Sequence, residues 1–134
     1  METGNLTVNV TFTHGEAGNA VSEVARIPPG WRPIFARLPA LAENTAALVI
    51  QVPGVDGSYA PVDGYDEDTA SADPLHIKCA ATNARVKRMA PEAFAGFGGS
   101  FKLAAYQSDL STAVAQAVGA EVDDVVVKID CRRY

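Results

Sequence analysis

The sequence predicts an all-β protein, an antiparallel β-sandwich of jelly-roll-like type with one short helical turn. Short segments in which apolar and polar residues alternate recur about every ten residues, as in many sandwich domains. Glycine, proline and aspartate gather between these segments, and such residues favour turns. With 134 residues, of which 48% are hydrophobic, the chain fits a single domain spanning residues 1–134.

The first and the last expected strands show the strictest alternation. Apolar residues occupy every second position from Leu6 to Phe12, and again from Val125 to Cys131. A period of two places alternate side chains on opposite faces of a sheet, so each strand has one buried face. Because the two segments alternate equally strictly, we expect both strands to lie in the same sheet.

Further strands are expected between these two, at residues 21–27, 34–38, 48–52, 59–62, 75–80, 85–89 and 101–106. The continuous apolar character of residues 48–52 predicts a central strand covered on both faces. Pro91 is placed to begin the single helical turn, at residues 91–94. The alanine-rich residues 109–120 are compatible with either a helix or an extended insertion.

Charge and hydropathy narrow the classes of partner. A net charge of −5 argues against a nucleic-acid binder, which needs a basic stripe. The basic residues Arg85, Lys87 and Arg88, together with Arg132 and Arg133, are interpreted as solvated surface charges. We expect no membrane partner and no signal peptide, and therefore synthesis in a cytoplasm.

No group of residues predicts catalysis. The histidines, His14 and His76, lie in no recognisable motif, and we therefore expect no enzyme and no cofactor. Cys79 and Cys131 are expected to be reduced, buried small side chains, and a zinc site is not expected. The acidic residues 63–68 favour a solvated loop over a calcium site, since their spacing completes no EF-hand.

Several segments together resemble a family of small structural proteins from tailed phages that decorate or cement the head. They lie within about residues 20 to 134, at residues 27–31, 38–41, 48–52, 56–62, 91–97 and 125–129. The resemblance implies a virion protein with a jelly-roll or related sandwich fold. It would bind the major capsid protein on the capsid exterior, often as a homotrimer. The stretches at 63–68 and 109–120 look longer than the hairpins of that family.

Two alternatives stay open. One is a carbohydrate-binding sandwich that stacks sugar rings on Trp31, Tyr59 and Tyr65, although Trp31 is expected to pack over the core. The other is a tail, receptor-binding or head-completion component.

Partner contacts are expected in the segments that a monomer core explains least. These are a flexible N-terminal arm at residues 1–5, the loop at 63–73 and the segment at 109–120. The candidate contact residues are Glu2, Thr3, Asn5, Tyr65, Asp66, Glu67, Asp68, Gln107, Asp109 and Gln116.

Overall fold

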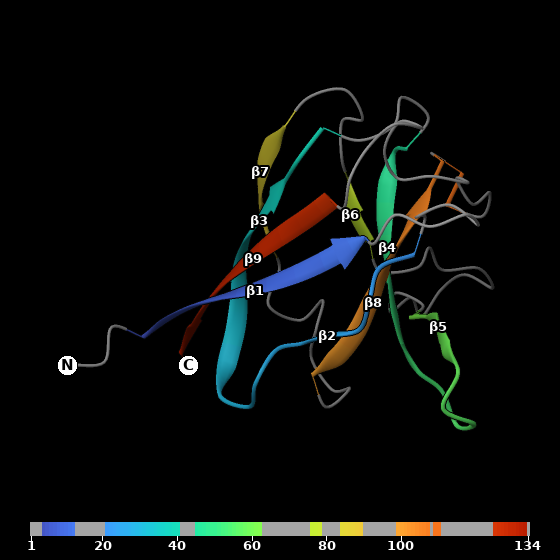
Figure 1. Cartoon of the computed structure of the whole chain (residues 1–134), viewed down its shortest axis with the longest axis horizontal. Coiled ribbons are helices and arrows are strands. Elements are labelled where there is room, and N and C mark those ends of the chain that lie inside the picture. The colour runs from blue at the N-terminus through green and yellow to red at the C-terminus, as the bar shows by residue number, and fades with distance from the viewer. Residues whose placement is uncertain are drawn as a thin grey trace, which may run out of the picture.

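The structure, a computed structural model, describes residues 4–12, 21–40, 45–62, 76–78, 84–89, 99–107, 109–110 and 125–133. These residues form nine β-strands in two antiparallel sheets (Figure 1). No helix occurs in these ranges, so none there is long and apolar enough to cross a membrane. The prediction of an all-β antiparallel sandwich is confirmed.

The first sheet has four strands in the order β1-β9-β3-β7: β1 (Asn5–Phe12), β9 (Val125–Arg133), β3 (Trp31–Leu38) and β7 (Arg85–Arg88). The second sheet has the order β2-β8-β4-β5: β2 (Ala25–Arg26), β8 (Ser100–Tyr106), β4 (Ala47–Pro53) and β5 (Tyr59–Pro61). A ninth strand, β6 (His76–Lys78), also pairs with β4.

Strand pairs in this fold are nested. β1 pairs with β9, β2 with β8, β3 with β7, and β4 with β5 and β6. Successive pairs alternate between the two sheets, and β9 also pairs with β3 to join the first sheet. The jelly-roll part of the expectation stays a prediction.

The hydrophobic core lies between the two sheets. Val10 and Phe12 of β1 and Ile129 of β9 are fully buried on one side, and Ile50 and Leu103 on the other. Burying an aliphatic or aromatic side chain of this size contributes about 1.5–3 kcal/mol. The expected alternation in the first and last strands is confirmed, and they are neighbours, with Val8 opposite Ile129.

The expected second strand, at residues 21–27, is only partly regular. Just Ala25–Arg26 forms a strand, because the segment divides its hydrogen bonds between the two sheets. The backbone N–H of Ser22 donates to the Leu103 carbonyl at 2.9 Å, and Leu103 N–H donates back to the Ser22 hydroxyl. One residue later, Glu23 N–H donates to the Thr11 carbonyl of β1 at 2.8 Å. Residues 22–23 therefore link the two sheets by hydrogen bonds at one side of the sandwich.

A β-bulge in β3 decides which side chains face outward. Pro33 pairs with Cys131 and Phe35 with the preceding residue, Asp130, so Ile34 is the extra residue. Such a bulge changes the side to which the following side chains point. Ala36 and Leu38 consequently face the core, while Phe35 and Arg37 face outward. The strand that we expected at 34–38 begins earlier in the structure, at Trp31.

The expected central strand at 48–52 corresponds to β4, whose residues from Ala47 to Ile50 are all buried. Both of its faces are therefore covered there, as expected. The strands expected at 59–62, 85–89 and 101–106 correspond to β5, β7 and β8, and β6 lies within 75–80. The helical turn expected at 91–94 and residues 111–120 of the alanine-rich segment lie outside the described residues.

One glycine, Gly99, lies where the chain after β2 approaches the start of β8. Gly99 precedes β8, has a φ of +89°, and accepts a hydrogen bond from Ile27 N–H at 2.8 Å. A Cβ atom at this position would overlap the carbonyl oxygen of Ile27. Both the backbone conformation and the close approach therefore require glycine.

Candidate interaction surface

The exposed side of the four-stranded sheet is the most distinctive surface in the described part of the chain. We call it the outer face, and we define it by Asn5, Thr7, Asn9, Phe35, Arg37, Val86, Arg88, Lys128, Asp130 and Arg132. These residues point away from the core because they alternate with core residues along a strand, or lie opposite outward-facing residues of a neighbouring strand.

Two rows of side chains cross this face. In one row, Thr7 lies opposite Asp130, Asp130 opposite Phe35, and Phe35 opposite Arg88. In the next row, Asn9 lies opposite Lys128, Lys128 opposite Arg37, and Arg37 opposite Val86. Each row therefore combines polar, basic and apolar side chains.

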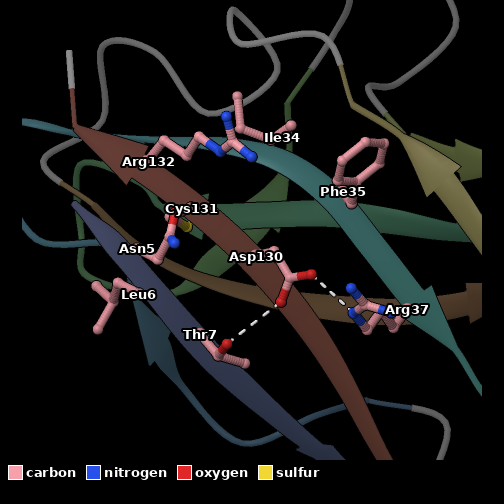
Figure 2. A pocket seen from close by; sticks show the side chains of 9 residues that line it. All are labelled: Asn5, Leu6, Thr7, Ile34, Phe35, Arg37, Asp130, Cys131 and Arg132. Atoms are coloured by element: carbon pink, nitrogen blue, oxygen red, sulfur yellow. Dashed lines mark hydrogen bonds and ion pairs between the residues drawn. The ribbon is translucent and has the colours of Figure 1, made fainter. Parts of the chain in front are cut away.

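Asp130 is the centre of a small hydrogen-bond network (Figure 2). Arg37 Nε donates to Asp130 Oδ2 at 2.7 Å, and Thr7 Oγ1 donates to Asp130 Oδ1 at 3.2 Å. The Arg37 side chain is 56% exposed and that of Asp130 27%, so solvent screens the ion pair. Its main effect is to hold the Arg37 guanidinium beside β9.

A shallow hollow of about 290 Å³ opens on this face where β3 bulges. Ile34 and Phe35 of β3, Leu6 of β1 and Arg132 of β9 are among its lining residues, and Figure 2 shows them around Asp130. Pockets for small molecules are usually of about 300–1,000 Å³ and enclose most of the ligand. An open hollow of this size is better suited to one inserted side chain.

The charge of this sheet is opposite in sign to that of the whole chain. Eight of the eleven Lys and Arg residues lie in its four strands, namely Arg32, Arg37, Arg85, Lys87, Arg88, Lys128, Arg132 and Arg133. Asp130 is the one acidic residue in the same strands. Four of these cations, Arg37, Arg88, Lys128 and Arg132, lie on the outer face together with Asp130. A cationic face on a protein of net charge −5 favours a negatively charged partner.

The second sheet offers no comparable face along its centre. Val49 of β4 and Ala104 of β8 alternate with core residues and so point away from the core, yet they are 0% and 1% exposed. The second sheet is therefore covered on both sides there. Within the described ranges, the centre of the second sheet is therefore closed to a partner, whereas the outer face of the first sheet is open to one.

Of the ten contact residues expected from the sequence, Asn5, Gln107 and Asp109 lie in the described part of the chain. Asn5 is exposed, begins β1 instead of ending a free arm, and lines the hollow. Gln107 and Asp109 follow β8 of the other sheet, in a turn where Leu110 N–H donates to the Gln107 carbonyl. The structure thus does not group them with Asn5. Outside the described residues lie Glu2, Thr3, Tyr65, Asp66, Glu67, Asp68 and Gln116.

Of the basic residues that we interpreted as solvated surface charges, Arg88 and Arg132 lie on the outer face, whereas Lys87 lies opposite the core residue Ala36. Arg88 of β7 and Arg132 of β9 both lie in the strands that flank β3. The sequence analysis did not single out Phe35, Arg37 or Lys128. The outward position of Phe35 and Arg37 depends on the bulge in β3, for which the sequence carries no local signal, whereas the alternation in β9 already places Lys128 on the polar face.

Trp31 and Tyr59, the aromatic residues considered for sugar stacking, each have a cation over the ring. The Arg133 guanidinium carbon lies 5.0 Å from the Trp31 ring centre, and Lys102 Nζ lies 4.8 Å from that of Tyr59. Trp31 is half-buried against the core, as expected, whereas Tyr59 belongs to the other sheet. The two rings do not form one stacking platform, and Tyr65 lies outside the described residues.

Cys131 is buried, as the sequence predicts. Burial raises the pKa of its thiol to about 11, and the neighbouring Asp130 carboxylate adds to this shift. The thiol is therefore protonated near neutral pH and packs as a small apolar group. Cys79, His14 and the acidic residues 63–68 lie outside the described residues. Elsewhere, within the described ranges, no group of three His, Cys, Asp or Glu residues could hold a metal ion.

Comparisons of the chain with protein-family models, with curated proteins and with solved structures find no match. The resemblance to phage head proteins therefore stays an expectation from the sequence.

Proposed function

We propose that this protein is a structural component of a phage virion that attaches to the capsid exterior by protein–protein contacts. The major capsid protein is its proposed partner. The observation that carries the proposal is the outer face, an open sheet surface with cationic, polar and apolar side chains on a closely packed sandwich. A protein that cements a shell needs such a rigid surface and no active site.

The nested strand pairs support a jelly-roll fold as part of this proposal. A jelly roll results when a long antiparallel hairpin is rolled up so that its successive strand pairs alternate between two sheets. The pairs from β1·β9 to β4·β5 follow this order. The described strand order therefore agrees with the fold that the resemblance implies.

The position of the N-terminal residues fits attachment through the same region. Asn5, the last residue of the expected arm, lies at the hollow of the outer face. An arm that leaves β1 at this point could extend contacts made by the face. We propose that deletion of residues 1–3 weakens capsid binding more than it destabilises the fold.

Co-sedimentation with heads tests the proposal. The purified chain is mixed with heads assembled from its proposed partner, the major capsid protein, and the heads are tested for rupture on heating. We expect saturable binding, heads that rupture at a higher temperature, and a trimer in light scattering. Heads that neither bind the protein nor become more heat-resistant would contradict the proposed function. A stable monomer would contradict the homotrimer alone.

A further inference from the structure

We propose that the outer face binds a carboxylate-rich segment of the partner protein, and that Arg88, Lys128 and Arg132 are its principal charged contacts. The inference rests on the proposed function, because it names the attaching surface and the chemistry of the segment that it meets. All three side chains are exposed. Within the described part of the chain, none of the three forms an ion pair.

The register of the strands places like charges next to one another. Lys128 lies directly opposite Arg37, and like charges in this arrangement destabilise a sheet. Asp130 offsets part of the repulsion through its ion pair with Arg37, but it leaves Lys128 and the outer residues Arg88 and Arg132 uncompensated in these strands. Carboxylates supplied by a partner would relieve the repulsion and form charge-assisted hydrogen bonds with the arginines.

A protein segment fits this surface better than a nucleic acid does. Phe35 is 36% exposed and Val86 56% exposed, so apolar area lies among the cations. Interfaces between proteins bury such aromatic and apolar groups, surrounded by polar contacts.

The hollow provides a place for one apolar side chain of the segment. Ile34 and Phe35 contribute its apolar lining, and Asn5 and Thr7 contribute polar groups. A segment with acidic residues on either side of an apolar one would therefore satisfy both features of the face. Contacts of this kind combine an apolar anchor with a charged rim.

The test compares two variants with the same change in net charge. The face variant carries Arg88→Gln, Lys128→Gln and Arg132→Gln. The control variant carries Arg26→Gln, Lys78→Gln and Lys102→Gln, which remove three positive charges from the second sheet. Thermal unfolding followed by circular dichroism establishes that both variants are folded. Binding is then measured by fluorescence anisotropy with labelled poly-L-glutamate, and with a single-stranded oligothymidylate of equal charge.

We expect the face variant to bind poly-L-glutamate about tenfold more weakly than the unmodified protein, and the control variant to bind within about twofold of it. Binding should weaken as salt is raised to about 0.15 M, because these charges are exposed. Equal losses in both variants would overturn the proposal, since only net charge would matter. No binding of poly-L-glutamate by the unmodified protein, or tighter binding of the oligothymidylate, would also overturn it.

Heads separate the failure of this proposal from failure of the proposed function. If heads bind the unmodified protein and the face variant equally, the capsid role stands and the outer face is not the attaching surface. If heads do not bind the unmodified protein while poly-L-glutamate binds through the face, the capsid role fails. The surface is then assigned to another acidic protein.

Discussion

Replacement of Gly99 by alanine tests how the strands β2 and β8 are joined. The φ of +89° is strained for any residue with a side chain, at a cost of about 1–3 kcal/mol. The added Cβ would overlap the Ile27 carbonyl oxygen, so the backbone must shift. That shift weakens the hydrogen bond from Ile27 N–H to the Gly99 carbonyl, which is worth about 1 kcal/mol. We expect Gly99→Ala to lower the free energy of unfolding by about 2–4 kcal/mol.

Gly57 provides a matched control for the steric part of this cost. It has a φ of +86° in the turn between β4 and β5, but a Cβ there would have no atom within 4 Å. Gly57→Ala therefore carries the backbone strain without the overlap. The difference between the two variants measures the overlap and the weakened hydrogen bond, about 1 kcal/mol or more.

Urea unfolding followed by circular dichroism measures both variants. For m-values of about 1–3 kcal/mol per molar urea, the expected difference separates their midpoints by about 0.3–1 M. A Gly99→Ala variant that is no less stable than Gly57→Ala would refute the argument that close backbone approach requires glycine.

Three further outcomes are expected. Leu103→Ala, at a fully buried position, should lower the free energy of unfolding by about 2–5 kcal/mol in urea titrations, and a loss below about 1 kcal/mol would contradict its core position. Asp130→Asn should cost less than about 1 kcal/mol, since the Arg37 pair is exposed, and a double-mutant cycle with Arg37→Gln checks this. The pKa of Cys131 is raised from 9.0 to about 11, so its contribution to stability should be lost as pH rises through that window. Cys131→Ala should lack this component, and an unchanged pH dependence would show that the thiol does not cause it.

Strict alternation made the first and the last strand of the chain, β1 and β9, predictable. In β1 and β9 every second residue from Val8 to Phe12 and from Val127 to Cys131 is buried, so pattern and burial coincide. The fully buried stretch of β4 was equally clear, because its run of apolar residues leaves no polar face. These segments carry their structural signal within a few neighbouring residues.

The same alternation predicts the part of the outer face that β1 and β9 form, but not the part that β3 and β7 form. Its composition depends on the bulge at Ile34, which reverses the direction of Phe35 and Arg37 without any local turn signal. It also depends on strand order, which places Arg88 and Lys128 in the strands on either side of β3 although they are far apart in sequence. Residues 21–27 looked like one strand, but Ser22 and Glu23 donate hydrogen bonds to different sheets, which no local sequence pattern predicts.

The central position of β9 has a consequence for the order in which the chain can fold. In the first sheet, β1 and β3 do not pair with each other, and both have β9 as their neighbour. During synthesis neither strand can complete its pairing until residues 125–133 have left the ribosome. Contacts so distant in sequence slow folding, and the waiting strands present unpaired edges meanwhile. Protection of the nascent chain should therefore matter most just before its last strand emerges.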